Sequence, residues 1–227
     1  MRHRMGEIGA PNPVFEVVAD AAALVAFGDR VGWPVIAKIS RGGYDGKGVW
    51  KLDSAAGAGV PFAALAESAS TVDGGTISRE GVRVIAEEFV PFVRELSALV
   101  VRSPSEQGVA YPISETVQTG GICTETVTPA PGMADEQQAG LQQLALRIAG
   151  ELGVVGLLAV ELMQRPDGSV VVNELAMRPH NTGHWTIDGA ATSQFENHLR
   201  AVADLPLGSP AHDPRWTVMV NVLGGSR

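Results

Sequence analysis

The sequence predicts an α+β fold of two lobes, a small α/β lobe followed by a larger lobe rich in antiparallel strands. Three observations lead to this prediction. Strand-like segments follow one another between residues 82 and 131 with short loops between them, and one long amphipathic helix comes after them over 135–152. The length of 227 residues also allows two lobes, since an average domain has roughly 150. We place the lobe boundary near 89–91.

The small lobe is expected to contain two helices and a hairpin. Apolar and small residues recur at helical spacing after Asp20, a suitable N-cap, and Gly32 follows as the stop. The β-branched run over 34–39 and the run over 49–52 read as two strands joined by a glycine-rich loop. A short helix is expected over 61–69.

The larger lobe is expected to form most of its sheet from consecutive strands. A pair of strands joined by an Asp-Gly turn follows the long helix, at 154–163 and 169–174. A helix over 193–203 and a last strand over 216–223 complete the chain. The strand candidates that precede the long helix are Val82–Val90, Arg94–Arg102, Val109–Gln118 and Ile122–Pro131.

Composition excludes several classes of protein. With 17 basic and 25 acidic residues the net charge is −8, which argues against a general nucleic-acid binder. Any bound phosphate must therefore meet a local group of cations and backbone amides. The lone Cys123 excludes an intramolecular disulfide and favours a reducing, cytoplasmic location. We expect no signal peptide and no membrane contact, because the most apolar stretch, 153–163, is much shorter than the ~20 residues of a membrane span.

A glycine-rich loop, SRGGYDGKG at 40–48, joins the two strands of the small lobe. Glycines let backbone amides approach an anion closely, and Lys38 and Lys47 supply point charges for phosphate oxygens. The pattern is neither that of a P-loop nor that of a Rossmann turn. The alternative is a plain hairpin turn with solvated lysines.

Two glutamates lie in apolar strands of the predicted hairpin, Glu161 in LLAVELM and Glu174 in VVNEL. An unpaired carboxylate would be costly there. Two carboxylates on one face can hold Mg²⁺, a hard ion that prefers oxygen ligands and takes further ones from substrate phosphates. Asn173 can join them only if the strand ends or twists there, since neighbours on a regular strand face opposite ways. The alternative is a pair of salt-bridged structural glutamates.

The loop that follows, 173–185, concentrates Arg178, His180, Asn181 and His184 within seven positions. Arginine can hold a phosphate through two hydrogen bonds, and histidines donate, accept or transfer protons near neutral pH. We therefore expect this loop to contact a substrate. The alternative is a solvated, capped loop, because loops are generally polar.

An acidic segment, AEEFVPFVRELS, lies at the predicted boundary between the lobes. Backbone groups around Glu87, Glu88 and Val90 could bind a planar base, and Glu95 could accept hydrogen bonds from ribose hydroxyls. The alternative is an acidic surface on an edge strand.

Taken together, the lysine strand, glycine loop, acidic hinge and glutamate pair resemble the ATP-grasp superfamily. More narrowly, the chain resembles its N5-carboxyaminoimidazole ribonucleotide synthetase family from about Pro13 to Leu223. The segments that carry this resemblance are IAKISRGGYDGKGVW, IAEEFVPFVRELS, YPISETVQ, NELAMRPHNTGHWT and SQFENHLRA. Two positions depart from the family pattern: Met177 stands where proline is usual and Gly120 where aspartate is common.

The resemblance implies an ATP-grasp fold, ATP and Mg²⁺ as cofactors with Mn²⁺ as an alternative ion, and ATP-dependent carboxylation of aminoimidazole ribonucleotide by bicarbonate. It implies Glu161 and Glu174 as metal ligands, and Arg178, His180, Asn181 and His184 as residues that face bicarbonate and the ribonucleotide. A homodimer is left open. The residues implied for the nucleotide are Lys38, Gly43, Tyr44, Asp45, Gly46, Lys47, Gly48, Glu87, Glu88, Phe89, Val90, Glu95, Gln118, Asn173 and Glu174.

The resemblance also divides the chain into a lead-in at 1–15, a small lobe at 16–88, a large lobe at 89–205 and the start of a C-terminal region at 206–227. We expect the two lobes to close on the nucleotide. The family's Rossmann-like N-terminal domain and most of its C-terminal lobe are expected to be missing from the chain. Two other functions stay open, a sister ligase acting on another acid and a nucleotide-binding fragment without turnover.

Overall fold

Two sheets organise the chain, one in each of two compact units, 13–90 and 1–12 with 91–227. The structure is a computed structural model and describes residues 1–41, 48–67, 82–212, 215–222 and 224. The division expected from the sequence fell at 15/16, 88/89 and 205/206, whereas the two compact units meet at 12/13 and 90/91. The α+β fold with antiparallel sheets is confirmed.

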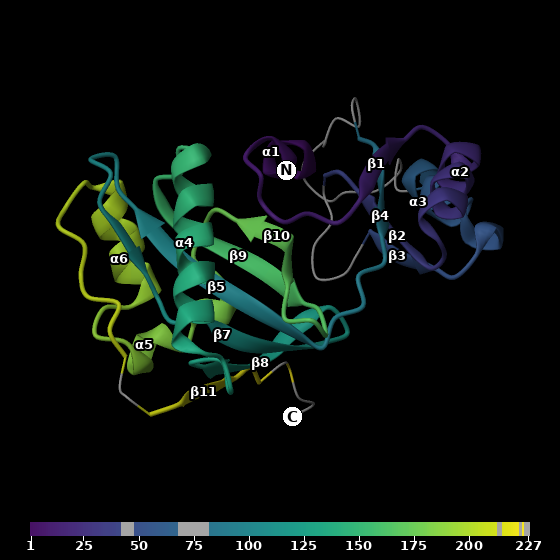
Figure 1. Ribbon diagram of the computed structural model, residues 1–227. Coiled ribbons are helices and arrows are strands. Elements are labelled where there is room, and N and C mark those ends of the chain that lie inside the picture. Colours follow the sequence, from purple (N-terminus) through teal and green to yellow (C-terminus); the bar gives the residue numbers. More distant parts are fainter. Residues whose placement is uncertain (42–47, 68–81, 213–214, 223, 225–227) are drawn as a thin grey trace. The chain divides into compact units, whose positions relative to one another are not determined.

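The small unit has a four-stranded antiparallel sheet in the order β1-β4-β2-β3. Helix α2 packs its buried Leu24 and Phe27 against Val35 and Ala37 of the sheet (Figure 1). Asp20 caps α2 as predicted, accepting a hydrogen bond from the Ala23 amide at 2.9 Å. The elements are β1 Phe15–Val18, α2 Ala21–Val31, β2 Val35–Ile39, β3 Val49–Leu52, the 3₁₀ helix η1 Ala55–Gly57, α3 Val60–Glu67 and β4 Val84–Glu88.

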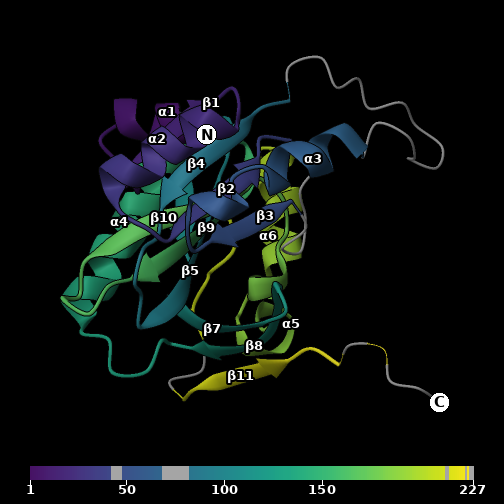
Figure 2. The ribbon, with the colours of Figure 1, turned by 90° about the vertical axis from the view of Figure 1, so that its right-hand side faces the viewer.

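The large unit has a sheet in the order β10-β9-β5-β7-β8-β11, with β6 paired to β5. Figure 2 shows β11 at the edge of this sheet, beside β8. The strands are β5 Arg94–Arg102, β6 Gly108–Ala110, β7 Ser114–Thr119, β8 Ile122–Thr128, β9 Gly156–Gln164, β10 Val170–Ala176 and β11 Thr217–Val220. The helices are α1 Arg2–Glu7, α4 Asp135–Glu151, η3 Asn181–Gly183, α5 Thr186–Gly189 and α6 Gln194–Val202.

Helices cover both faces of the large sheet. Because side chains alternate along a strand, Leu96, Ala98 and Val100 of β5 pack toward α4, which crosses the sheet in Figure 1. Leu99 and Val101 belong to the core on the other face, which includes Ala201 of α6. Between Leu96 and Val101 this central strand is buried and apolar except for Ser97, which lies on the α6 side.

One expected strand is divided. The segment 109–118 contains two short strands, β6 and β7, separated by Tyr111, Pro112 and Ile113. Proline lacks the N–H that a continuous ladder needs, so the pairing stops there and resumes at Ser114. The turn between β7 and β8 consists of Gly120 and Gly121, both at positive φ (61° and 83°). Glycine adopts this conformation without steric cost.

Both ends of the chain are part of the large unit. Met5 of α1 is fully buried in the core beneath α4, and the guanidinium of Arg2 donates to the carbonyl of Asn173 at 2.9 Å. At the other end, β11 pairs with β8, and Met219 packs on the core that contains Trp185. The lead-in expected at 1–15 therefore includes helix α1 of the large unit and, at its end, Phe15, the first residue of strand β1 of the small unit.

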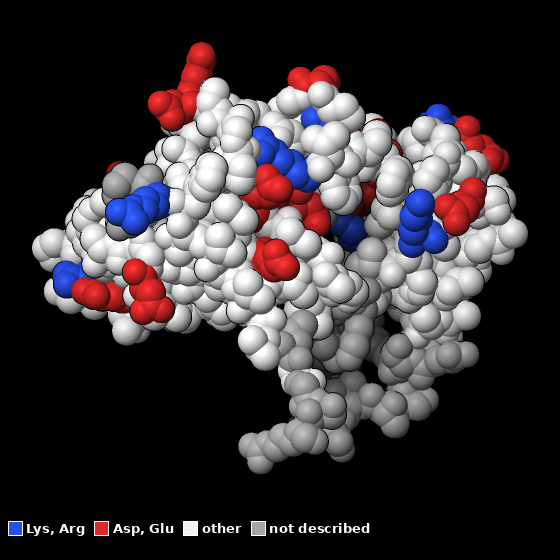
Figure 3. Space-filling view, turned by 90° about the horizontal axis from the view of Figure 1, so that it is seen from below, with Lys and Arg blue, Asp and Glu red and all other residues white. Residues whose placement is uncertain are grey.

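Among the described residues, no helix is both long and apolar enough to cross a membrane. On the face shown in Figure 3, the described basic side chains stand in small groups near acidic ones and form no continuous basic area.

Candidate functional site

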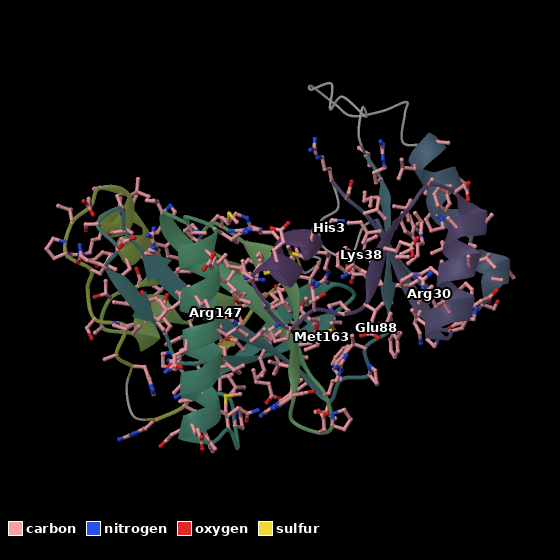
Figure 4. The ribbon with its side chains drawn as sticks, turned by 45° about the horizontal axis from the view of Figure 1, so that its top comes forward. His3, Arg30, Lys38, Glu88, Arg147 and Met163 are labelled. Atoms are coloured by element: carbon pink, nitrogen blue, oxygen red, sulfur yellow. The ribbon has the colours of Figure 1, made fainter. Side chains whose placement is uncertain are left out.

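In the small unit, Lys38 of β2 forms an ion pair with Glu87 of the adjacent strand β4. The Lys38 Nζ lies 2.9 Å from Glu87 Oε2, and Glu87 is only 3% exposed. The register places Glu87 opposite Ile36, so the ion pair is a diagonal contact across the two strands. Figure 4 labels Lys38 in this unit. A lysine that is about one quarter exposed thus compensates a buried carboxylate while its ammonium can still reach a further anion.

The other small-unit candidates lie at the end of β4 and in the glycine loop. Phe89 receives a cation–π contact from Lys51, whose Nζ lies 4.8 Å from the ring centroid, and Val90 is buried. The amide of Glu88 donates to the Val14 carbonyl at 2.9 Å. Gly48 has φ of 77°, and a Cβ there would lie 2.5 Å from the Ile39 side chain, so glycine is required. Gly43, Tyr44, Asp45, Gly46 and Lys47 lie outside the described residues.

In the large unit, Glu161 and Glu174 are direct partners across the β9–β10 hairpin. Paired residues of antiparallel strands point to the same face, so both carboxylates can serve one ion. Asn173 falls at a break in register between Val172 and Glu174. That irregularity meets the condition under which Asn173 could join the pair. Arg2, 3% exposed, holds this break through the carbonyls of Val172 and Asn173.

The glutamates continue a row of polar residues across the sheet. Glu161 pairs with Ser97 of β5, and Ser97 pairs with Ser114 of β7. Glu95 lies two residues before Ser97 on the same face, and burial raises the pKa of its carboxyl above the ordinary value. Gln118, on β7, is half-buried opposite Cys123, where the register with β8 shifts.

The loop after β10 places His180 beside Glu161. The His180 Nε2 lies 3.6 Å from Glu161 Oε1, and its Nδ1 lies 2.9 Å from the Thr182 hydroxyl. Burial first, then the positive charges of Arg178 and His184, lower the pKa of His180 to about 4. The ring is therefore neutral at pH 7, and its contact with Glu161 is not an ion pair.

The backbone of His180 is fixed by the fully buried Gln194 at the start of α6. The Gln194 amide nitrogen donates to the His180 carbonyl at 2.7 Å, and its Oε1 accepts from the His180 amide at 3.0 Å. Gly183 makes this approach feasible, since a Cβ there would lie 2.4 Å from Gln194 Oε1. These two hydrogen bonds therefore fix the position of the loop backbone.

The loop contains three further predicted site residues, Asn181, His184 and Arg178. The Asn181 amide donates to the Cys123 carbonyl at 3.2 Å, and Asn221 donates to the same carbonyl at 2.7 Å and to Asn181 Oδ1 at 2.6 Å. His184 stacks on Phe195, with ring centroids 5.9 Å apart. Arg178 is exposed, and its guanidinium donates to the Pro179 carbonyl at 3.1 Å.

The large unit thus gathers two carboxylates, a neutral histidine and an exposed arginine at one face of a sheet. Among the described residues, no group of three or more His, Cys, Asp or Glu could hold a metal by itself. The Glu161–Glu174 pair suits an ion that takes its remaining ligands from a substrate, as Mg²⁺ does with phosphates.

Sequence reasoning missed four residues that support this site: Arg2, Ser97, Gln194 and Asn221. Ser97 left a signal, a hydroxyl in the otherwise apolar stretch 96–101. The others are polar residues in segments predicted as a chain terminus, a helix start or the last strand, and only tertiary contacts single them out.

Comparison with known proteins gives the family. Residues 3–195 match the ATP-grasp domain family. The chain is 51% identical over 231 residues to the N5-carboxyaminoimidazole ribonucleotide synthase of Mycobacterium leprae, covering 99% of this chain and 50% of that protein. The chain thus spans about half the length of the curated relatives it matches.

Solved structures agree. A carboxyaminoimidazole ribonucleotide synthase from Aspergillus clavatus complexed with ATP is 30% identical with a TM-score of 0.85, over 99% of this chain and 56% of that one. The enzyme from the same organism with ADP and 5-aminoimidazole ribonucleotide is 28% identical with a TM-score of 0.84, at the same coverage.

Proposed function

This chain belongs to the ATP-grasp family, and on that premise we propose that it carboxylates 5-aminoimidazole ribonucleotide with ATP and bicarbonate, giving the N5-carboxyamino product of purine biosynthesis. The observation that carries the proposal is the direct pairing of Glu161 with Glu174, with His180 3.6 Å from Glu161. The likeness to synthases solved with ATP, and with ADP and the ribonucleotide, supports this reading.

We assign some contacts with the nucleotide to residues of the small unit and others to residues of the large unit. In the small unit, Lys38 and the loop from Gly43 to Gly48 would bind the phosphates, and Glu87 to Val90 would frame the adenine. The ion pair with Glu87 holds the Lys38 ammonium in place beside its strand. In the large unit, Glu95 would bind the ribose and Gln118 would line the nucleotide site.

Glu161 and Glu174 are the proposed metal ligands, with Asn173 assisting. Mg²⁺ bound there would offset negative charge on the transferring phosphoryl group. The residues fit this ion because two carboxylates paired on one face offer hard oxygen donors and leave room for phosphate oxygens.

The loop after β10 would bind the other substrates. A bicarbonate oxygen attacks the γ-phosphorus of ATP, and ADP leaves, which gives carboxyphosphate. The exocyclic amine of the ribonucleotide then attacks the carboxyl carbon, and phosphate leaves with the bonding electron pair while the amine loses a proton. Arg178, exposed beside this loop, would stabilise the anionic mixed anhydride. His180, Asn181 and His184 would orient the bicarbonate and the amine through hydrogen bonds.

ADP release with and without bicarbonate and aminoimidazole ribonucleotide tests the proposal. We expect Mg²⁺-dependent ADP release that requires bicarbonate and a carboxylated product when the ribonucleotide is present. Release that depends on formate or an amino acid instead would indicate a sister ligase, and nucleotide binding without any release would indicate a binding protein; both outcomes would overturn the proposal. From the proposed reaction we also propose a cytoplasmic location. The reaction is compatible with a homodimer.

A further inference from the structure

Two asparagine side chains meet at one backbone carbonyl of the large unit. Asn181, in the loop after β10, donates from its side-chain nitrogen to the Cys123 carbonyl at 3.2 Å. Asn221, directly after β11, donates to the same carbonyl at 2.7 Å and to Asn181 Oδ1 at 2.6 Å. These residues are distant in the sequence, and the pairing of β11 with β8 brings Asn221 to the other two (Figure 2).

The backbone of Asn221 is itself held by the sheet. Strand β11 pairs with β8 up to Val220, which lies opposite Glu125, and the Asn221 amide then donates to the Thr124 carbonyl at 2.8 Å. The side chain of Asn221 therefore extends from a backbone position that the strand pairing sets. Asn221 thus connects the last strand of the sheet to the loop that we propose to bind substrate.

The orientation of the Asn181 amide follows from what each group can do. A backbone carbonyl only accepts hydrogen bonds, so the atom of Asn181 that faces Cys123 must be the nitrogen. Asn181 Oδ1 then faces Asn221, whose nitrogen is the donor. Among the described residues, one hydrogen of Asn181 Nδ2 has an acceptor, the Cys123 carbonyl. Asn181 is half-buried, so its second N–H can reach a substrate.

We propose that Asn221 is a positioning residue that holds the Asn181 amide so that it offers an N–H donor to an oxygen of bicarbonate. The identity of the substrate rests on the proposed function, whereas the amide orientation does not. A donor that is already oriented toward an oxygen anion needs no reorganisation during the reaction. The exocyclic amine of the ribonucleotide is the poorer recipient, because its lone pair forms the new bond to carbon and must stay accessible.

Side-chain amide signals in ¹H–¹⁵N spectra of the full chain test the positioning role without any activity. The signals of Asn181 are assigned by their loss in Asn181→Asp. Asn221→Leu keeps the approximate size of the side chain and removes its donors. We expect the Asn181 amide protons to exchange with solvent on the order of 10-fold faster in this variant. An unchanged exchange rate would overturn the positioning role.

Asn221→Asp serves as the second variant if Asn221→Leu does not fold. A carboxylate only accepts, so the Asn181 nitrogen should turn toward the new carboxylate and away from the Cys123 carbonyl. We therefore expect both side-chain amide proton signals of Asn181 to shift. Asn181 signals that keep their positions in Asn221→Asp would contradict the proposal as well.

A matched control lies on β8, next to Cys123. The Thr124 hydroxyl donates to the Val117 carbonyl at 3.2 Å and lies 3.2 Å from the Thr119 hydroxyl, and both of these partners belong to β7. Thr124→Val also removes a side-chain hydrogen bond to a backbone carbonyl, but not one to the loop. It should leave the Asn181 signals unchanged. A change equal to that in Asn221→Leu would overturn the specific role of Asn221.

Kinetics tests which substrate receives the hydrogen bond. We expect Asn221→Leu to raise the KM for bicarbonate in ADP release about 10-fold, because the contact from Asn181 is weakened. The KM for ATP should stay unchanged, which a general loss of structure would not produce. A rise in the KM for the ribonucleotide in place of bicarbonate would overturn the assignment of the donor to bicarbonate.

A double variant tests whether Asn221 acts through Asn181. If it does, Asn181→Ala combined with Asn221→Leu should raise the KM for bicarbonate no further than Asn181→Ala alone. Additive losses would contradict the proposal. If Asn221→Leu releases the Asn181 amide but the unmodified protein shows no bicarbonate-dependent ADP release, the proposed function fails and the positioning of Asn181 stands.

Discussion

Glu161 of β9 and Glu174 of β10 stand directly opposite each other across an antiparallel hairpin, and both point to the face of the sheet that carries the His180 loop. Between Val172 and Glu174 the pairing shifts register, and the buried Arg2 holds that irregularity through two backbone carbonyls. The carboxylate pair is therefore fixed by a strand irregularity and by a residue some 170 positions away in the sequence.

Replacing either carboxylate tests the proposed metal ligands. Glu174→Gln and Glu161→Gln should each lower Mg²⁺-dependent ADP release by about 10²–10³-fold, because a neutral amide cannot offset the charge of the ion. Release measured over a magnesium titration is the readout, with the exposed Glu136→Gln in α4 as the control. Cleavage that persists in Glu174→Gln removes that residue from the metal site.

Lys38 should serve both stability and nucleotide binding. Lys38→Met is expected to cost about 3 kcal/mol in the free energy of unfolding, because the buried Glu87 loses its cation, and to weaken ATP binding strongly. Urea unfolding and calorimetry measure the two effects.

A double variant separates these two roles of Lys38. Lys38→Met with Glu87→Gln should regain much of the stability but not the ATP affinity. Arg30→Met, which breaks an exposed ion pair with Glu16, should cost about 1 kcal/mol at most. Unchanged ATP affinity in Lys38→Met would contradict the assignment of this lysine.

Cys123 should be unreactive in the native protein. Burial, and then the negative charges of Glu161 and Glu95, raise the pKa of its thiol to about 11. The thiol form therefore dominates at pH 8, and a thiolate-specific disulfide reagent should react far more slowly with the folded chain than with the chain unfolded in guanidinium. The chain has one cysteine, so the labelling signal is unambiguous. Equal rates in the two states would disprove the prediction.

Tyr111 should make the protein sensitive to alkali. Burial raises the pKa of its hydroxyl to about 12, and that hydroxyl donates to the Thr192 carbonyl and accepts from Asn197. Between pH 10 and 12 the unfolded chain loses this proton while the folded chain keeps it, so stability is complete below pH 10 and falls as the pH rises.

The comparison of Tyr111→Phe with the unmodified protein isolates this effect. At pH 8 the variant should be less stable by about 1–2 kcal/mol, because Asn197 and Thr192 lose a partner. Its unfolding free energy, measured in urea, should then decline less steeply between pH 8 and 11. Parallel pH profiles for the two proteins would rule out Tyr111 as the cause.

The sequence predicted the local elements of both units well, because their signals are local. The Asp20 cap, the strand Arg94–Arg102 and the β9–β10 hairpin each follow from a few neighbouring residues, and the structure places all three as predicted. The hairpin pattern alone, however, continues the register of Val172 with Leu162 and would pair Glu161 with Asn173. Only the register shift between Val172 and Glu174 brings Glu174 opposite Glu161.

Pairing between segments that are far apart in the sequence could not be predicted from local sequence patterns. Nothing near Thr217–Val220 indicates that β11 adds to the sheet beside β8, and nothing near Arg2 indicates that it binds the carbonyls of β10. The division of 109–118 into two strands differs from these cases, because Pro112 is a local signal that a continuous strand would stop there.

The sequence by itself therefore determined the types of element, the family resemblance and the chemical groups of the site. Tertiary structure alone decided that Ser97 meets Thr182, that Gln194 fixes His180 and that Asn221 shares a carbonyl with Asn181. The physical reason is that hydrogen bonds between residues distant in the chain depend on the register of the sheet and on the position of each loop relative to it. No local periodicity of the sequence encodes either quantity.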